Sequence, residues 1–336
     1  MPTAQPLVAI CMATYEPDPA LLERQIESIR AQTHANWVCV VSDDGSSGER
    51  LARLRELAGS DPRFHLSESE ERLGFYLNFE RALAAAPSEA ELIALADQDD
   101  EWFPEKLATL VGSLGGAELV YSDMRIVDEQ GQLISGTFWR GRRNNHTDLA
   151  SLLLANTVTG AASLFPRGLL DLVLPFPPRL GDAFHDHWIA AVALARGAIA
   201  YVDRPLYDYV QHGEAAAGHA AAMRGWDPRR LVRWRDPGAT LAAIGEHGER
   251  SYEQNLRRVA LAAQTLETRL GGRMTPNKER AVRRVAALDR AGAGSAAWLA
   301  LRSLRRLFGR NETMGIELSL LAAILWKRLG PGRGTP

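Results

Sequence analysis

The stretch LIALADQDD, residues 92–100, joins an apolar run to an acidic turn. A run of apolar residues without alternation is typical of a strand buried on both faces, as in a parallel sheet. Two earlier runs, Leu7–Met12 and Trp37–Val41, have the same character, and polar residues follow each of them. These runs predict central strands whose carboxyl ends carry polar side chains.

Helical patterns separate these strands. Asp18 and Pro19 fit the N-cap and the first position of a helix, which Leu21, Leu22 and Ile26 continue at helical spacing. Further helical patterns occupy residues 51–57, 75–85 and 104–114. Strands that alternate with helices predict an α/β domain with a Rossmann-like, mostly parallel central sheet and helices on both faces.

Polar side chains gather where the predicted strands end. In an open α/β sheet, ligands bind beyond the carboxyl ends of the strands. The residues at these positions are Thr14, Tyr15, Glu16, Asp43, Asp44, Asp97, Gln98, Asp99 and Asp100. We expect their loops to converge on one edge of the sheet and to form a binding site.

The acidic turn Asp97–Asp100 offers hard oxygen ligands. Mg²⁺ and Mn²⁺ take such ligands together with substrate phosphates, and a solvated acidic turn is the alternative that the residues leave open. No G-x-G-x-x-G or G-x-x-x-x-G-K-[ST] pattern occurs, so nicotinamide, flavin and P-loop sites lose their main support. The cofactor hypothesis is therefore a divalent metal that holds a diphosphate.

Charge divides the chain into two parts. Residues 1–223 carry 17 basic and 31 acidic residues, a net charge of −14, and residues 224–336 carry 22 basic and 10 acidic residues, a net charge of +12. An acidic first part argues against a nucleic-acid partner, and a basic second part favours an anionic partner such as a membrane surface. We expect a catalytic domain at 1–223 and a basic helical region at 224–336, which contacts a membrane or packs against a second subunit.

The sequence predicts a cytoplasmic location. Residues 1–6 lack a basic segment, so we expect no secretory signal, and no apolar run reaches the ~18 residues of a membrane span. Cys11 and Cys39 lie in apolar runs and are expected to be buried and reduced. Arginine and leucine interleave over residues 301–310, starting with Leu301 and Arg302, and Leu318–Trp326 is apolar. These stretches predict interfacial or packing helices, so peripheral attachment to the inner face of the plasma membrane stays open.

A series of motifs spans about residues 7–215. They are ATYE (13–16), SDDGSS (42–47), LGFYLNF (73–79), ALADQDDEW (94–102), YSDM (121–124), NTVTG (156–160), FHDHW (184–188) and YDYVQH (207–212). Their order and spacing resemble family 2 glycosyltransferases with the GT-A fold, and from LGFYLNF onward they resemble the rhamnosyltransferase-like branch. The resemblance implies transfer of a sugar from a nucleoside diphosphate donor with a divalent metal.

The resemblance also implies a role for each matching residue. The donor-binding residues would be Thr14, Tyr15, Glu16, Asp43, Asp44, Arg72, Asp97 and Gln98. Asp43 and Asp44 match the pair that binds the base and ribose. Asp99 matches the direct metal ligand, and His212 matches a position that contacts the metal or the diphosphate. For Arg72, a surface arginine is the alternative.

Asp186 matches the general base of inverting members of the family. Sugar transfer needs a carboxylate within reach of the acceptor hydroxyl, and Asp186 lies at a predicted helix start. A helix N-cap is the alternative reading of this residue. The neighbouring His185 and His187 are read as flanking histidines rather than catalytic ones.

The sequence thus predicts an inverting, metal-dependent transferase with Mn²⁺ or Mg²⁺. The donor would be dTDP-rhamnose or a UDP-hexose, and the acceptor a surface glycan or a lipid-linked glycan. Processive synthases of the wider family carry Q-x-x-R-W beside membrane spans, but Arg230–Trp234 begins with arginine, which favours addition of a single sugar. The rivals are a nucleotidyltransferase, which would open with a Gly-rich basic loop unlike Ala13–Glu16, and a non-catalytic scaffold that binds sugar nucleotides.

Overall fold

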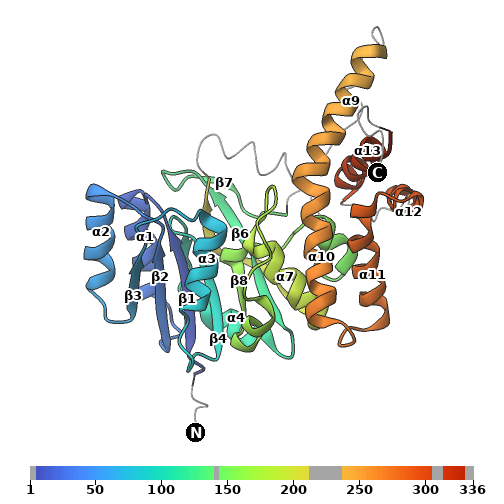
Figure 1. The fold of residues 1–336 in the computed structure, drawn as a ribbon. Helices are drawn as coiled ribbons and strands as arrows, with labels where there is room; N and C mark the ends of the chain where they lie inside the picture. Colours follow the sequence, from blue (N-terminus) through green and yellow to red (C-terminus); the bar gives the residue numbers. More distant parts are fainter. Residues whose placement is uncertain (1–4, 140–143, 212–236, 305–312, 330–336) are drawn as a thin grey trace. The chain divides into compact units, whose positions relative to one another are not determined.

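A computed structural model describes residues 5–139, 144–211, 237–304 and 313–329 (Figure 1). The chain forms two compact units. The first contains Met1–Gly141, Val158–Phe176 and Phe184–Ala215, and the second contains Arg142–Thr157, Pro177–Ala183 and Ala216–Pro336. The boundary that the sequence predicts at residue 223 lies outside the described residues.

The first half of the central sheet is parallel. Its strands are β1 (Val8–Thr14), β2 (Trp37–Asp43), β3 (Phe64–Glu68) and β4 (Leu92–Ala96), in the order β3-β2-β1-β4. Thr14 pairs with Asp43, and Met12 pairs with Ala96, so the carboxyl ends of β1, β2 and β4 reach the same edge. The polar residues that follow these strands are therefore brought together, as the sequence predicts.

The second half of the sheet is mixed. Its strands are β8 (Ser163–Pro166), β6 (Leu119–Val127), β9 (Ile199–Val210) and β5 (Glu101–Trp102), with β7 (Leu133–Ser135) beside β6. β8 runs antiparallel to both β4 and β6, whereas β6 and β9 are parallel. The pairing of β6 with β9 shifts register near Asp123. The α/β class is confirmed, with antiparallel pairs beyond β4.

Helices cover both faces of this sheet (Figure 1). They are α1 (Pro19–Arg30), α2 (Gly48–Gly59), α3 (Phe75–Ala84), α4 (Lys106–Leu114), α6 (Leu170–Val173) and α7 (His185–Arg196). The predicted cap of α1 is confirmed, because the Asp18 carboxylate accepts hydrogen bonds from the backbone N–H groups of Ala20 and Leu21 at 3.0 and 3.1 Å. Such a cap satisfies N–H groups that have no partner within the helix.

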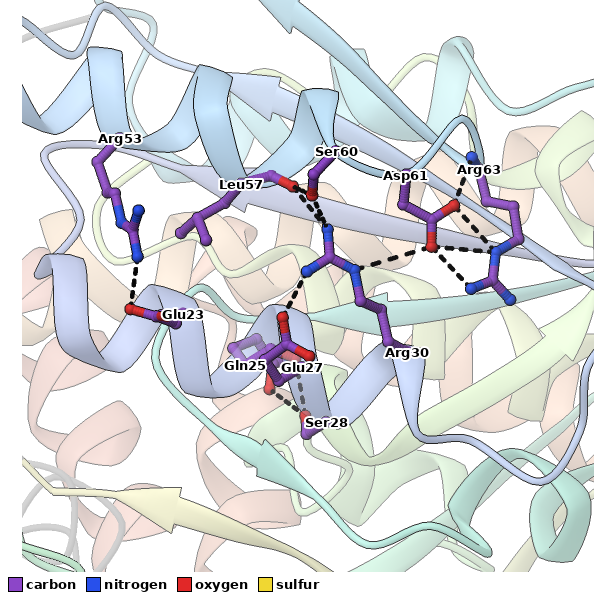
Figure 2. Close-up of polar contacts among 10 residues, drawn as sticks. All are labelled: Glu23, Gln25, Glu27, Ser28, Arg30, Arg53, Leu57, Ser60, Asp61 and Arg63. Atoms are coloured by element: carbon purple, nitrogen blue, oxygen red, sulfur yellow. Dashed lines mark hydrogen bonds and ion pairs between the residues drawn. The ribbon is translucent and has the colours of Figure 1, made fainter.

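Arg30 joins the end of α1 to the end of α2 (Figure 2). Its guanidinium donates to the carbonyl oxygen of Leu57 at 2.7 Å and to Ser60 Oγ at 2.5 Å. It also pairs with Glu27, and its Nε lies 3.7 Å from Asp61 Oδ2. One arginine therefore satisfies acceptors from two helices and fixes their packing.

The second unit is helical. Its helices are α5 (Leu149–Leu154), α9 (Pro237–Ser251), a π-helical segment (Tyr252–Leu256), α10 (Arg257–Leu270), α11 (Pro276–Ala286), α12 (Ala293–Ser303) and α13 (Met314–Leu329). α13 packs against α9 and α12, and α11 packs against α10 and α5. α9, the π-helical segment and α10 follow one another as a long rod (Figure 1). Within the described ranges, no helix has the length and apolar character needed to cross a membrane.

The apolar stretch near the end of the chain forms part of this unit's core. Leu320, Ala323 and Ile324 of α13 are buried, whereas Leu325 is exposed. Arg302 is also buried, and its guanidinium donates to Glu317 Oε1 at 2.7 Å and to Ser151 Oγ at 2.8 Å. Arg302 therefore contributes no charge to an interfacial surface, because its charge is neutralised inside the unit. Residues 305–310 of the predicted interfacial or packing stretch lie outside the described residues.

Candidate functional site

The ends of β1 and β2 are tied together by a buried carboxylate. Thr14 Oγ1 donates to Asp43 Oδ1 at 2.9 Å, and the backbone N–H and hydroxyl of Ser46 donate to the same carboxylate at 2.8 and 2.6 Å. Asp43 is fully buried. An ionised carboxylate accepts up to about four hydrogen bonds. The Asp43 carboxylate therefore holds the loop after β2 in place.

Asp44 links this loop to the start of α3. Its two carboxylate oxygens accept from the backbone N–H groups of Leu73 and Gly74 at 2.8 and 2.7 Å. Gly74 has a φ of 81°, a conformation that glycine adopts without steric cost. Asp44 is almost fully buried, so its carboxylate fixes the chain that leads into LGFYLNF.

Two residues of α3 support the same edge and were not singled out from the sequence. Asn78 Nδ2 donates to the carbonyl oxygens of Thr14 and Ser42 at 3.1 and 2.9 Å. Arg81 donates to Ser42 Oγ at 2.7 Å and also to the carbonyl oxygen of Asp43. Asn78 is buried beside Phe79, although a polar residue on a helix is usually exposed.

The loop after β1 is clasped to the acidic turn after β4. The backbone N–H of Tyr15 donates to Gln98 Oε1 at 2.8 Å, and Gln98 Nε2 donates back to the carbonyl oxygen of Tyr15 at 3.2 Å. The Arg72 guanidinium lies over the Tyr15 ring, 3.9 Å from its centroid. Tyr15, Arg72 and Gln98, which the sequence assigns to donor binding, are thus brought together.

Glu16 fixes the other side of this loop. Its backbone N–H donates to Ser46 Oγ at 2.7 Å, and its Oε1 accepts from the N–H and hydroxyl of Ser47 at 2.8 and 2.9 Å. Its φ of 43° lies in the left-handed region, which is uncommon for a residue other than glycine. The Glu16 side chain is therefore engaged in holding the loop.

The acidic turn and Asp186 lie close together. Burial, and then the charges of Asp99 and Asp186, raise the pKa of Asp97 to about 7. Tyr209 of β9 faces the same group, because burial and the charges of Asp97, Asp100 and Asp99 raise its pKa. The structure therefore concentrates carboxylates from β4 and α7 at one place, which favours a bound cation.

A buried lysine lies behind the turn. Burial raises the pKa of Asp100 well above its usual value and lowers that of Lys106. Lys106 Nζ donates to the carbonyl oxygen of Ala161 at 2.5 Å and lies 3.6 Å from the ring centroid of Trp102. Among the described residues, Asp100 Oδ2 has no hydrogen-bond partner. The sequence alone does not point to a role for Lys106, although its charge acts on both Asp97 and Asp100.

Asp186 lies in the first turn of α7, whose N-cap is Phe184. Asp186 Oδ1 accepts from the backbone N–H of His187 at 2.6 Å, and the side chain is half-buried. The alternative reading of Asp186 as the N-cap is therefore wrong, because the helix begins at His185. Its carboxylate remains partly accessible at the acidic edge.

His185 packs into the interior instead of facing the site. Its ring stacks on Phe79 with centroids 3.7 Å apart, and burial lowers its pKa to about 3. A side chain at Gly160 would place its Cβ 2.8 Å from His185 Nε2 and 3.3 Å from Asp186 Cβ. Gly160, the glycine of NTVTG, therefore leaves the space that the start of α7 fills.

Two exposed aromatic rings contact each other at the start of α7. Phe75, at the start of α3, is 42% exposed, and Phe184 is 44% exposed. Their ring centroids lie 5.4 Å apart. Exposed apolar side chains that contact each other at a polar edge form a surface against which the apolar face of a ligand packs.

A divalent metal fits these residues through Asp97 and Asp99. Mg²⁺ is commonly held by one or two carboxylates together with substrate phosphates. Burial is the main cause of the raised pKa of Asp97, and the charges of Asp99 and Asp186 add to it. Across the described ranges, no group of three or more His, Cys, Asp or Glu side chains is arranged to hold a metal ion. His212, the other predicted ligand, lies outside the described residues.

Comparisons with known proteins agree with this fold. The sequence model of glycosyl transferase family 2 matches residues 9–171. An uncharacterized glycosyltransferase of Nostoc sp. is 30% identical over 216 residues, which cover 60% of this chain and 63% of that protein. The beta-1,3-glucosyltransferase WfgD of Escherichia coli is 31% identical over 124 residues, 36% of this chain and 47% of that protein. This chain spans less than two thirds of either relative.

Among solved structures, S. aureus TarS 1-349 matches with a TM-score of 0.53 and 15% identity, over 96% of this chain and 92% of that one. The fold is that of the GT-A glycosyltransferases. Residues 9–171 match the glycosyl transferase family 2 model, and α7, which carries the candidate base Asp186, follows them in the chain.

Proposed function

We propose that this chain transfers a single sugar from a nucleoside diphosphate sugar to an acceptor hydroxyl, with inversion at the anomeric carbon. The observation that carries the proposal is that Asp186 of α7 lies near enough to the acidic turn after β4 for its charge, like that of Asp99, to act on Asp97. The family 2 domain at residues 9–171 supports the reaction class.

The donor would bind across the loops after β1, β2 and β4. We propose that Thr14, Tyr15, Glu16, Asp43 and Asp44 form the nucleotide pocket. Arg72 and Gln98, which both contact Tyr15, would border the diphosphate. TarS has been solved with UDP-GlcNAc, and WfgD is named for UDP-Glc, so a UDP-hexose is one donor candidate. The rhamnosyltransferase-like motifs favour dTDP-rhamnose as the other.

The metal would be Mn²⁺ or Mg²⁺, held by Asp99 and Asp97, with His212 as a further contact to the metal or the diphosphate. When bound, such an ion neutralises the charge that develops on the leaving diphosphate. The chain itself supplies the rigid turn, because the clasp between Tyr15 and Gln98 fixes its position. The positive charge of Lys106 opposes the negative charges of Asp97 and Asp100.

Asp186 would act as the general base. Its carboxylate takes the proton of the acceptor hydroxyl as the acceptor oxygen bonds to the anomeric carbon, and the bond from that carbon to the diphosphate oxygen breaks with its electron pair. Phe75 and Phe184 would contact an apolar face of the acceptor beside this carboxylate. We propose a surface glycan or a lipid-linked glycan as acceptor, in line with the diphosphoundecaprenol acceptor in the name of WfgD.

We further propose that the second unit attaches the protein peripherally to the inner face of the plasma membrane. Residues 224–336 carry a net charge of +12, and basic residues near an anionic surface each contribute about 1 kcal/mol. Contact with a second subunit is the competing use of this unit. Attachment would place the enzyme beside a lipid-linked acceptor.

A donor screen tests the proposed function. Thermal shift is measured with UDP-Glc, UDP-GlcNAc and dTDP-rhamnose, each with Mn²⁺ and with EDTA, and transfer is measured with a GlcNAc-diphosphate lipid. We expect one donor to raise the Tm only with Mn²⁺, because a ligand that binds the folded state stabilises it, and we expect turnover with that donor. Binding without donor hydrolysis or transfer would indicate a scaffold. Pyrophosphate release from a nucleoside triphosphate and a sugar phosphate would indicate a nucleotidyltransferase.

A further inference from the structure

A basic groove lies between α11 and α12 of the second unit. It has a volume of about 860 Å³ and is lined by Arg280, Arg283, Arg284, Arg290, Trp298 and Leu301. Glu279 is the acidic residue in its wall. The groove therefore combines an excess of positive charge with an apolar side, within one compact unit of the chain.

Most of the positive charge in this groove is not neutralised by the protein. Arg283 is paired with Glu267 and Glu279, at 3.2 and 3.5 Å. In the part of the chain that the structure describes, Arg284 and Arg290 form no ion pair, and both are exposed. Arg280 donates only to the neutral side chain of Asn277, at 3.3 Å. Guanidinium groups in this state bind phosphate oxygens through paired N–H donors.

Another part of the groove's lining is apolar. Leu301 of α12 is 65% exposed, and Trp298 lies one turn before it on the same helix. Gly292 and Gly294 line the groove, and no heavy atom lies within 4 Å of where their Cβ would be. A small ion would need no such wall, so the groove suits a molecule that joins an anionic group to an apolar chain.

We propose that this groove binds the phosphate headgroup of an anionic membrane lipid, with Arg280, Arg284 and Arg290 on the phosphate. Trp298 and Leu301 contact the glycerol and upper acyl region, where amphipathic aromatic side chains are favoured. The inference rests on the proposed membrane attachment and narrows it to one site. The proposed contacts with the lipid do not include Arg302, which is buried against Glu317.

Vesicle flotation of the full chain tests the groove. The vesicles contain 30% phosphatidylglycerol in phosphatidylcholine, with pure phosphatidylcholine as the reference. Arg284→Gln/Arg290→Gln removes the two cations without an ion pair, and Arg250→Gln/Arg328→Gln removes the same charge from exposed positions of α9 and α13. We expect the groove variant to weaken binding about 30-fold, the effect of two basic residues at the surface, and the control variant to weaken it less than threefold.

A second variant separates a lipid from a soluble phosphate. Leu301→Gln should weaken vesicle binding about fivefold or more and leave the thermal shift with inorganic pyrophosphate unchanged, because the exposed Leu301 contacts only the apolar part of the ligand. If the unmodified chain does not float with anionic vesicles, the membrane attachment itself is wrong. If it floats but the groove and control variants weaken binding equally, attachment is diffuse and the groove is not the site. Binding of pyrophosphate without vesicle binding would indicate a soluble phosphate ligand and overturn the lipid assignment.

Discussion

Asp97 and Asp186 come from distant parts of the sequence, yet the charge of Asp186 raises the pKa of Asp97. Asp97 follows β4, and Asp186 lies in the first turn of α7. Like charges at one place are unfavourable unless a cation joins them or a proton binds. Their proximity is the feature of this fold that most directly favours a metal and a base at one site.

Asp97→Asn should stabilise the metal-free protein while it abolishes metal-dependent donor binding. The folded-state pKa of about 7 lies above the ordinary value of 3.8. The neutral carboxyl therefore stabilises the fold at low pH, and this contribution is lost as the pH rises through 7. At pH 8 in EDTA we expect the Tm of the variant to rise by several degrees, a stability gain of about 1–4 kcal/mol. Asp171→Asn, at an exposed position, is the control, and a lower Tm for Asp97→Asn would contradict the charge argument.

His185 should make the protein less stable in mild acid. Its folded-state pKa of about 3 lies below the ordinary 6.5, so between these values only the unfolded chain binds the proton, and stability falls as the pH falls. We expect about 2 kcal/mol to be lost between pH 6.5 and pH 5 through this residue. In urea denaturation, His185→Gln should show a correspondingly flatter pH profile, and His65→Gln, at an exposed position, should not. Parallel profiles for His185→Gln and the unmodified protein would rule out this role.

Arg30→Gln should destabilise the first unit. The change removes the bonds to the Leu57 carbonyl and Ser60 Oγ, and it leaves Asp61 with one cation fewer (Figure 2). We expect a loss of about 1–3 kcal/mol in urea denaturation. The control is Arg53→Gln, since Arg53 pairs with Glu23 and Glu56 at the surface and such pairs contribute about 0–1 kcal/mol. Equal losses for the two variants would show that Arg30 does not fix the packing of α1 on α2.

Phe184→Ala should weaken acceptor binding without affecting the donor. The exposed ring contacts Phe75 at the start of α7, and loss of such a surface costs about 1–1.5 kcal/mol, or about tenfold in KM for the acceptor that supports turnover. The KM for the donor should stay within twofold. Leu133→Ala, at a 61% exposed position on β7, controls for the loss of an exposed apolar side chain. A selective rise in the donor KM would assign Phe184 to the donor side.

The sequence predicts the parallel half of the fold well because its strands are buried on both faces. Leu7–Met12 and Leu92–Ala96 are continuous apolar runs, and the polar residues after them reach one edge by the geometry of a parallel sheet. The antiparallel position of β8 was not predictable in this way. Ser163–Pro166 is too short to carry a pattern, and contacts with β4 and β6 decide its direction.

Part of the site depends on long-range contacts that a single sequence does not reveal. The sequence alone does not point to a role for Asn78 or Lys106, because a polar residue on a helix is usually exposed to solvent. Both are buried here, and both act on residues distant in sequence. Likewise, Ser151 joins the second unit through its bond to Arg302, which charge counting along the chain does not predict.

The most direct test of the proposed reaction is single-turnover transfer by Asp186→Asn with saturating donor and Mn²⁺. The variant keeps the shape of the side chain and removes its basicity, so donor affinity should stay within twofold while the transfer rate falls by about 10²–10⁴, the usual contribution of a general base. Asp182→Asn, at an exposed position, should transfer at the rate of the unmodified protein. A transfer rate of Asp186→Asn within a few-fold of that rate would show that Asp186 is not the base.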